Sequence, residues 1–225
     1  AQVWFLFCTE TESWDSFRSS FRNMGSSQIA HFILASASPR RIELLKELGW
    51  NFTVKPSDSE EVLICGESPE DTACRLAEMK ASNVAEANPG EWVVGADTLV
   101  ALGTTSLGKP KNDKEAFAMI AMLQGKTHRV ITAVAVISPE GEKYVEYETT
   151  NVVFRPLSDE EIASYIALGE SLDKAGAYAI QGRGMLLVER IDGCYFNVVG
   201  LPVQKLSVLL AKLGLSLREQ WGMFR

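Results

Sequence analysis

The residue best suited to chemistry in this sequence is Asp97, the only ionisable residue in the eleven-residue run from Trp92 to Leu102. A carboxylate among apolar neighbours loses water, which raises its pKa and suits it to proton abstraction. The same group could ligate a hard cation. Gly95 supports a different interpretation, an ordinary aspartate in a turn between two strands. The local pattern leaves these interpretations open.

The stretch SASPRR, residues 36–41, places two serines and two arginines where a helix is predicted to begin. A helix N-terminus offers unpaired N–H groups to phosphate, and Ser36 and Ser38 add hydroxyl donors. Arg40 and Arg41 add planar guanidinium groups that match phosphate oxygens. Cations there oppose the helix dipole by about 0.3–1 kcal/mol each, and a bound phosphate chain would reverse that cost. Two exposed arginines behind an ordinary N-cap are the alternative.

Lys80 and an acidic pair form two further candidates. Lys80 falls on the apolar face of a predicted helix, where it either snorkels at the edge or points into a site. Glu60 and Glu61 follow a predicted strand, and paired carboxylates can hold Mg²⁺ or Mn²⁺ together with substrate phosphate. A solvated loop is the alternative for the glutamates.

The last candidates lie in GKP and DKAGAYAIQGRG. Lys109 occupies a turn in the first motif, and Lys174 in the second could serve phosphate. Gln181 carries an amide that can read the edge of a base. Small residues in the second motif let backbone approach a ligand closely. Each of these signals is weak alone.

The elements that must position these residues alternate along the chain. The sequence predicts strands at 32–35, 51–55, 92–102, 129–138, 143–155 and 184–191. It predicts helices at 39–48, 69–87, 113–124, 158–168 and 203–213. Because strands and helices interleave first and longer strands follow, we expect an α/β fold with a mixed twisted sheet flanked by helices. Two lobes around a central cleft are the expected arrangement.

Composition excludes several classes of protein. The formal net charge of the 225-residue chain is −7, so a general nucleic-acid or membrane binder is not expected and any anion site must be local. The four cysteines form no CxxC pair and only two histidines are present, which argues against a zinc site or a disulfide framework. No apolar run reaches the roughly 20 residues that span a bilayer, and reduced thiols are the simplest interpretation, so a cytoplasmic location is expected.

Residues 1–27 read differently from the rest, being Ser-rich and weakly periodic. We expect an atypical leader there, either disordered or foreign to the natural protein, with Met24 as a candidate natural start. Residues 28–225 are expected to form the functional domain.

In their order and spacing, LASASPRR, SEE, the Lys80 helix, GADT, GKP and DKAGAYAIQGRG resemble the Maf family of nucleoside triphosphate pyrophosphatases over about residues 31–213. The eleven-position separation of Thr98 and Lys109 also fits that family. The resemblance implies hydrolysis of a nucleoside triphosphate to the monophosphate and pyrophosphate with a divalent cation, Mg²⁺, Mn²⁺ or Co²⁺. It further implies an inosine-triphosphatase-like architecture, a homodimer as the common assembly, and a link to cell-division arrest.

The resemblance also assigns roles by position. Asp97 matches the catalytic acid-base residue of the family and Glu61 its acidic metal-site residue, with Glu60 a weaker candidate beside it. Lys109 joins the catalytic set, and Asp97 and Glu61 are the implied metal ligands. The remaining matches are implied to bind substrate: Ser36, Ser38, Arg40, Arg41, Lys80, Thr98, Lys174 and Gln181.

Three of these positions, Arg40, Thr98 and Gln181, resemble the dTTP/UTP subgroup. The subgroup that acts on 7-methyl-GTP carries Trp, Gln and Glu there, and a carboxylate with an aromatic face suits a cationic base. An amide that both donates and accepts suits a neutral pyrimidine. One departure is Ala179, which replaces the usual glycine of AYGIQ.

Three alternatives remain from the sequence. The same chemistry could act on another base, such as a modified pyrimidine or inosine. A nucleotide-binding regulator with little turnover is a second possibility, although phosphate binding alone needs no general base. In a purely structural protein, the third, Arg41 and Lys80 would affect stability rather than ligand affinity.

Overall fold

A computed structural model describes residues 31–62, 64 and 66–222 of the chain. The predicted leader, residues 1–27, lies outside the described residues, as do Cys8 and Cys65. None of the described helices has the length and apolar composition needed to span a bilayer.

The fold is built on one mixed sheet of seven strands in the order β2-β1-β3-β5-β6-β7, with β4 pairing separately with β3. Only β1 pairs in parallel, with β2 and β3, and the other pairs are antiparallel. The strands are β1 (Phe32–Leu34), β2 (Phe52–Val54), β3 (Trp92–Leu102), β4 (Thr105–Leu107), β5 (Thr127–Ile137), β6 (Lys143–Phe154) and β7 (Val188–Asp192).

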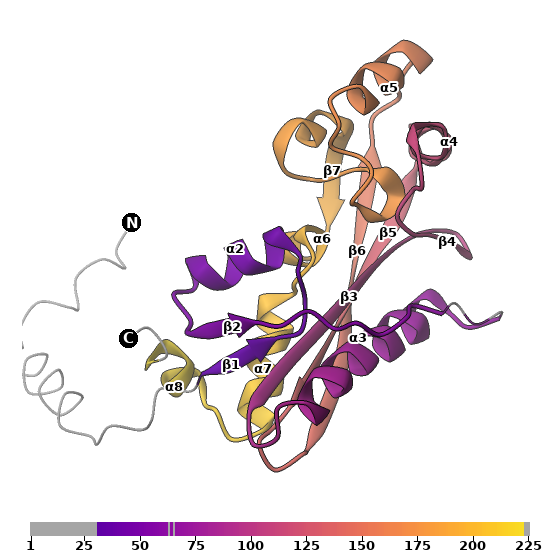
Figure 1. The fold of residues 1–225 in the computed structure, drawn as a ribbon. Coiled ribbons are helices and arrows are strands. Elements are labelled where there is room, and N and C mark those ends of the chain that lie inside the picture. Colours follow the sequence, from indigo (N-terminus) through magenta and orange to yellow (C-terminus); the bar gives the residue numbers. More distant parts are fainter. Residues whose placement is uncertain (1–30, 63, 65, 223–225) are drawn as a thin grey trace, which may run out of the picture.

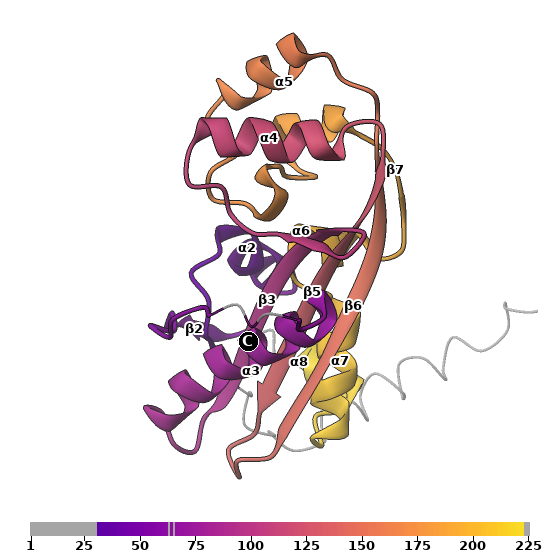
Figure 2. The ribbon, with the colours of Figure 1, turned by 90° about the vertical axis from the view of Figure 1, so that its right-hand side faces the viewer.

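Helices cover both faces of this sheet (Figures 1 and 2). The α-helices are α2 (Pro39–Glu47), α3 (Pro69–Glu86), α4 (Asp113–Leu123), α5 (Asp159–Ile166), α6 (Tyr195–Val199), α7 (Val203–Lys212) and α8 (Leu217–Gly222). Two 3₁₀ segments are η1 (Ala175–Ala177) and η2 (Gly182–Leu187). The α/β prediction, with a mixed sheet flanked by helices, is therefore confirmed.

The two faces of the sheet have separate hydrophobic cores. On one face α3 packs its small residues, Ala73, Ala77 and Ala81, against β3 and β5. On the other face α2 and α7 pack leucines against the same central strands, and this core continues to α4 and α5. Apolar side chains on both faces of β3 and β5 explain why these strands read as nearly continuous hydrophobic runs.

The long strands β3, β5 and β6 connect two lobes, as predicted (Figures 1 and 2). One lobe holds β1, β2, α2, α3 and α7. The other holds α4, α5, β7 and the two 3₁₀ segments. The middle of β3, which carries Asp97, lies between the lobes, and side chains from both line the cavity there.

The predicted strand at 184–191 is wrong in its first half. The strand begins at Val188, and residues 182–187 form η2 instead. Gly182 has φ +64°, which strand geometry does not allow, and a Cβ on Gly184 would lie 2.1 Å from the Ala179 carbonyl oxygen. These glycines permit a tight turn against residue 179. The sequence patterns also missed three short elements, β4, α6 and α8.

Candidate active site

The edge of β3 that faces β1 is only partly covered. Pairing with β1 ends at Val94 and pairing with β4 starts at Val100, so no described strand covers residues 95–99 on that edge. A cavity of about 470 Å³ opens at this gap. Cavities of this size commonly hold small-molecule ligands.

The cavity gathers ten of the eleven residues that the sequence nominated. They come from α2 and the loop before it, from α3 and β3, and from the loops after β2, after β4 and before η1. These residues are Ser36, Ser38, Arg40, Arg41, Glu61, Lys80, Asp97, Thr98, Lys109 and Lys174. Glu60, the weaker acidic candidate, is exposed and does not line the cavity.

Gln181 is the exception, because the structure does not bring it to the cavity wall. In the segment before it, Tyr178 and Ile180 line the cavity whereas Ala179 and Gln181 do not. The sequence motif contained Gln181 but gave no indication of which of its residues reach the cavity.

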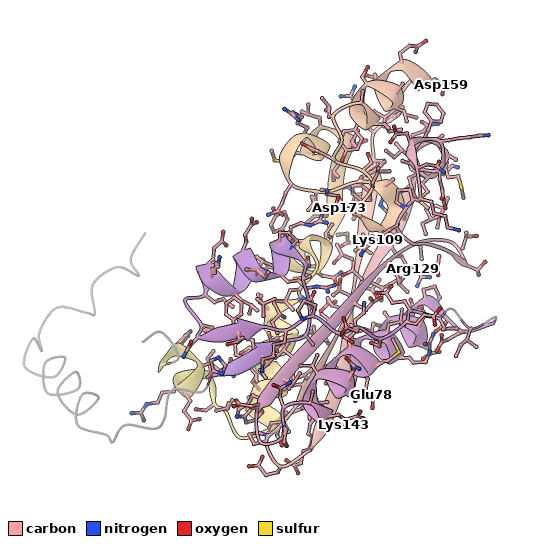
Figure 3. All side chains as sticks on the ribbon, in the orientation of Figure 1. Glu78, Lys109, Arg129, Lys143, Asp159 and Asp173 are labelled. Atoms are coloured by element: carbon pink, nitrogen blue, oxygen red, sulfur yellow. The ribbon has the colours of Figure 1, made fainter. Side chains whose placement is uncertain are left out.

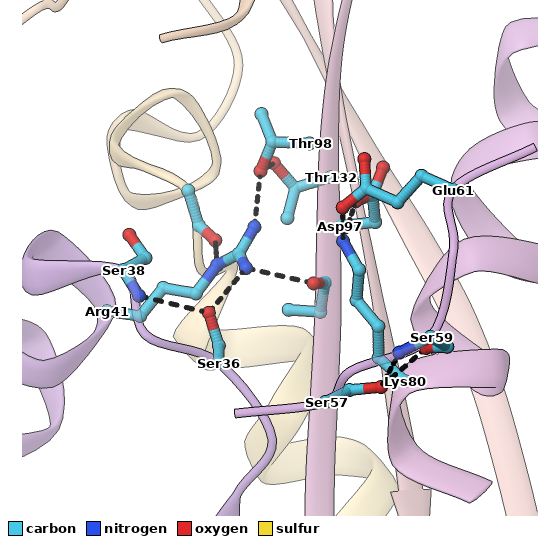
Figure 4. Close-up of polar contacts among 12 residues, drawn as sticks. Ser36, Ser38, Arg41, Ser57, Ser59, Glu61, Lys80, Asp97, Thr98 and Thr132 are labelled. Atoms are coloured by element: carbon cyan, nitrogen blue, oxygen red, sulfur yellow. Dashed lines mark hydrogen bonds and ion pairs between the residues drawn. The ribbon is translucent and has the colours of Figure 1, made fainter. Parts of the chain in front are cut away.

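Asp97 lies at the centre of the gap and pairs with Lys80 (Figure 4). The Lys80 Nζ atom lies 2.5 Å from Asp97 Oδ1 and 2.7 Å from Glu61 Oε1. The lysine side chain is only 14% exposed, so it points into the site rather than snorkelling. One ammonium group therefore holds two carboxylates from different segments.

Gly95 allows this arrangement. It lies within β3, not in a turn, and on the same strand face as Asp97. A Cβ at residue 95 would lie 2.5 Å from the Ala77 carbonyl oxygen of α3 and 2.8 Å from the Ala81 nitrogen. The missing side chain thus lets α3 approach β3 closely enough for Lys80 to reach Asp97.

The environments of the two carboxylates shift their pKa values in opposite directions. Burial raises the pKa of Asp97 above its usual value, although the nearby Lys80 and Arg41 charges oppose this shift. Burial would also raise the pKa of Glu61, but the hydrogen bond and charge of Lys80 outweigh it and lower that pKa. In a divergent pair of this kind, the carboxyl with the raised pKa is suited to exchange protons and the one with the lowered pKa stays ionised.

Arg41 is buried beside Asp97 and is held by four protein acceptors (Figure 4). Its Nε donates to the Gly200 carbonyl at 2.7 Å, and its Nη1 donates to Ser36 Oγ and the Ala96 carbonyl, both at 2.9 Å. Its Nη2 donates to Thr98 Oγ1 at 2.9 Å. Since a guanidinium has five N–H donors, at most one remains for a ligand.

The structure therefore separates two arginines that the sequence treated alike. Arg40 lines the cavity half-buried, and its side chain makes no hydrogen bond to any described residue, so its guanidinium can meet a ligand. Ser38 is the N-cap residue of α2, but its side chain makes no capping bond. The Ser36 hydroxyl accepts from Arg41 and from the Ser38 amide at 3.3 Å, and its own proton is still available to donate.

Lys109 and Lys174 come together because their loops touch. The Gly176 amide donates to the Gly108 carbonyl at 3.0 Å, which fixes the loop after β4 against η1. Lys174 Nζ lies 2.5 Å from Asp173 Oδ1. Figure 3 labels Lys109 and Asp173 in the region between α2 and the upper helices.

The charge of the cavity differs from that of the chain. Five cationic side chains and three carboxylates line it, whereas the whole chain has a formal charge of −7. The expectation that any anion site would be local is met by this arrangement. Such a pocket attracts a polyanion within a molecule that repels anions overall.

A family model described as Maf-like protein matches residues 31–213. This chain belongs to the Maf family. The resemblance predicted from the motifs, over the same residues, is thereby confirmed.

Relatives support this membership. A protein of Caldicellulosiruptor bescii named dTTP/UTP pyrophosphatase is 50% identical over 192 residues, which cover 83% of this chain and 96% of that protein. A protein of the same name from Alkaliphilus oremlandii is 52% identical, over 79% of this chain and 93% of that one. Among solved structures, the Staphylococcus aureus Ham1 protein matches with a TM-score of 0.41 and 18% identity, over 55% of this chain and 71% of that chain.

The Maf chain offers few ligands for a metal. Among the described residues, no three His, Cys, Asp or Glu side chains are grouped for metal binding. Asp97 and Glu61 are the two carboxylates that share Lys80, and one or two carboxylates plus substrate phosphate are the usual donors to Mg²⁺. The donor set therefore fits a hard cation that arrives with a phosphate chain.

Sequence reasoning missed several residues of this Maf site. Asp173 lines the cavity beside Lys174, and Ser57 lines it from the loop after β2. Gly200 supplies the carbonyl that holds Arg41 and has φ +121°. A glycine between α6 and Pro202 was the one available signal, since a positive φ favours glycine.

Proposed function

We propose that this Maf-family chain hydrolyses dTTP and UTP at the α–β anhydride, giving the nucleoside monophosphate and pyrophosphate. The observation that carries the proposal is the convergence of cationic side chains from separate segments around a buried carboxylate with a raised pKa. The names of the relatives at about half identity support the same reaction and the same bases.

In the proposed reaction, a water oxygen attacks the α-phosphorus and the bridging bond to the β-phosphate breaks. Asp97 accepts the proton from the attacking water, and pyrophosphate leaves with the electron pair of the broken bond. Lys80 holds Asp97 in place at 2.5 Å and partly offsets the effect of burial on its pKa. Arg40, Lys109 and Lys174 face the charge that collects on the leaving group.

We propose that Asp97 and Glu61 hold a divalent cation, Mg²⁺, Mn²⁺ or Co²⁺, together with substrate phosphate oxygens. When bound, such a cation withdraws electrons from the phosphoryl oxygens and neutralises part of the triphosphate charge. The lowered pKa of Glu61 keeps this carboxylate ionised and ready to bind a cation.

For the base, we propose that the apolar part of the cavity lining receives a pyrimidine. Val130, Tyr178, Ile180 and Val198 belong to that lining. The subgroup positions Arg40 and Thr98 line the cavity as well, whereas Gln181 lies outside its wall. Gln181 therefore requires its own test: if it reads the base, Gln181→Glu raises KM for dTTP with little change in kcat.

The deciding experiment is a nucleotide panel scored separately for pyrophosphate and orthophosphate. We expect pyrophosphate from dTTP and UTP and much slower turnover of 7-methyl-GTP. Asp97→Asn should abolish turnover while retaining nucleotide affinity by calorimetry. Faster hydrolysis of 7-methyl-GTP contradicts the base assignment, and tight binding by the wild type without pyrophosphate release indicates a nucleotide-binding regulator.

We further propose that the chain acts as a homodimer linked to division arrest, as the family resemblance implies, and that it is cytoplasmic, as the cysteine usage suggests. Exposed apolar side chains on η2 and α6 support an interface, because Met185 is 61% exposed, Leu186 73% and Phe196 42%. Sedimentation velocity tests the proposed homodimer, and a monomer at all accessible concentrations would contradict it.

A further inference from the structure

Asn197, on α6, is buried completely and does not line the cavity. Its amide makes three hydrogen bonds. The Nδ2 group donates to the Val130 carbonyl at 2.8 Å and to Thr150 Oγ1 at 3.0 Å. The Oδ1 atom accepts from the Thr132 amide at 3.1 Å. The short helix α6 is thereby fixed to both β5 and β6 by one side chain.

The main-chain carbonyl of Asn197 has two partners of its own. It accepts from the Gly200 amide at 3.0 Å and from the Thr132 hydroxyl at 2.9 Å. Gly200 in turn accepts from Arg41 Nε at 2.7 Å, so the first contact connects Asn197 to the guanidinium through one residue.

The contact between the Thr132 hydroxyl and the Asn197 carbonyl begins a chain of hydrogen bonds that runs through two hydroxyl groups to Arg41. Figure 4 draws this chain from Thr132 to Arg41. Because the Thr132 proton goes to the Asn197 carbonyl, Thr132 Oγ1 must accept in its 3.0 Å contact with Thr98 Oγ1. The Thr98 hydroxyl therefore donates to Thr132, and its lone pairs accept from Arg41 Nη2 at 2.9 Å. Every bond runs in one direction, from Arg41 towards Asn197.

Asn197 is thus connected to Arg41 twice, through Gly200 to Nε and through Thr132 and Thr98 to Nη2. Arg41 also binds β3 on both sides of Asp97, through the Ala96 carbonyl and Thr98 Oγ1. A shift of this arginine would therefore move the strand that carries the proposed proton acceptor.

We propose that Asn197 is a positioning residue for catalysis, which sets Arg41 and Thr98, and through them Asp97, from outside the cavity. The proposal rests on the proposed function for its kinetic consequences, but not for its structural ones. A displacement of about 1 Å far from the reacting atoms can cost two orders of magnitude in rate.

The kinetic test uses Asn197→Ala, with Gln220→Ala as a matched control. Gln220 is a buried amide on α8 that donates to the Ser207 and Leu215 carbonyls at 2.9 and 2.7 Å and does not line the cavity. We expect Asn197→Ala to lower kcat for dTTP at least tenfold with KM changed less than threefold. Gln220→Ala should lower the melting temperature with kcat within twofold of the wild type. Equal kcat losses in both variants would overturn the proposal.

A double-mutant cycle identifies the route of action. In an Arg41→Lys background, Asn197→Ala should lower kcat less than twofold further, whereas the losses of stability should add. Fully additive losses of kcat would mean that Asn197 does not act through Arg41. If Asn197→Ala fails to fold, Thr132→Val is the alternative, because it removes only the Thr132 hydroxyl that links Thr98 to Asn197 and keeps a side chain of nearly equal volume. We expect Thr132→Val to lower kcat at least threefold. Unchanged turnover in this variant would refute the proposal.

A readout independent of turnover separates this proposal from the proposed function. The Arg41 Nε–H proton donates to Gly200 and should exchange slowly with solvent in nitrogen-15 spectra. We expect exchange at least tenfold faster in Asn197→Ala and unchanged in Gln220→Ala, whichever nucleotide the wild type hydrolyses. Unchanged exchange in Asn197→Ala would overturn the positioning role even in an active enzyme.

Discussion

Replacing Lys80 by methionine tests the central ion pair directly. The Asp97 side chain is 8% exposed, and its hydrogen bond to a cation is the one from Lys80 at 2.5 Å. Lys80→Met keeps an apolar stem of similar length and removes the ammonium group. Breaking a buried pair from one side costs about 3–5 kcal/mol while the remaining charge stays ionised. When Asp97 is protonated, its own loss is one hydrogen bond, about 1 kcal/mol. The contact of Lys80 with the half-exposed Glu61 is lost as well.

The cost of this substitution therefore depends on pH, with a definite sign. The pKa of Asp97 already lies above its ordinary value of 3.8, and losing Lys80 raises it further. Between the ordinary and the raised pKa, the folded state binds more protons than the unfolded state, so the free energy of unfolding falls as pH rises. Once pH rises past the raised Asp97 pKa of the wild type, only the variant continues to lose stability, so the difference between the two should grow with pH. The acidic limb of the kcat/KM profile should also move to higher pH.

Denaturant unfolding at a series of pH values measures this difference. Lys143→Met is the control, because Lys143 and Glu78 are each 48% exposed and 3.7 Å apart, and an exposed pair contributes less than about 1 kcal/mol. If the free energies of unfolding of the wild type and Lys80→Met differ by the same amount at every pH, Asp97 is not a buried carboxylate coupled to Lys80. An equal loss in the control would refute that coupling as well.

Three further substitutions probe the supporting structure. Gly95→Ala places a Cβ 2.5 Å from the Ala77 carbonyl oxygen, so we expect a loss of about 1–3 kcal/mol in denaturation and a lower kcat as α3 shifts. Gly200→Ala meets no close atom but holds φ +121°, so strain of about 1–3 kcal/mol should lower the melting temperature. Burial lowers the pKa of His128 from 6.5 to about 4. The unfolded state therefore binds more protons between these values, and stability should fall by about 3 kcal/mol as pH drops through them, a dependence that His128→Gln removes in acid titration.

Local patterns predicted the elements well because their signals lie within a few residues. The Ser158 side chain accepts from the Glu161 amide in a complete capping box, and the helix begins there as expected. The Ser68 side chain likewise caps α3 through the Asp71 amide. An isolated charge in an apolar run was a sound indication that Asp97 is buried, with a raised pKa.

Distant contacts could not be predicted from such patterns. Arg40 and Arg41 are neighbours of identical type, and the buried one is distinguished by distant acceptors such as the Gly200 carbonyl, 159 positions away from Arg41. The position of Gln181 outside the cavity wall depends on the path of the chain between η1 and η2, which the sequence pattern does not reveal. Asn197 carried no recognised motif, because its partners lie on β5 and β6 and its role follows only from their geometry.

The gap between β1 and β4 explains how Asp97 and Arg41 can be buried and still line the cavity. A continuous strand along β3 would cover residues 95–99 and close the cavity, whereas a wider gap would leave the backbone of β3 unpaired. Arg41 takes the Ala96 carbonyl in place of a strand partner and brings a positive charge to the gap. The same interruption therefore lets Asp97 line the cavity, brings the Arg41 charge near it, and requires a second support for that arginine. The bonds from Gly200 and Thr98 to Asn197 provide that support, so the cost of interrupting the sheet is offset outside the cavity, where no ligand competes for the donors.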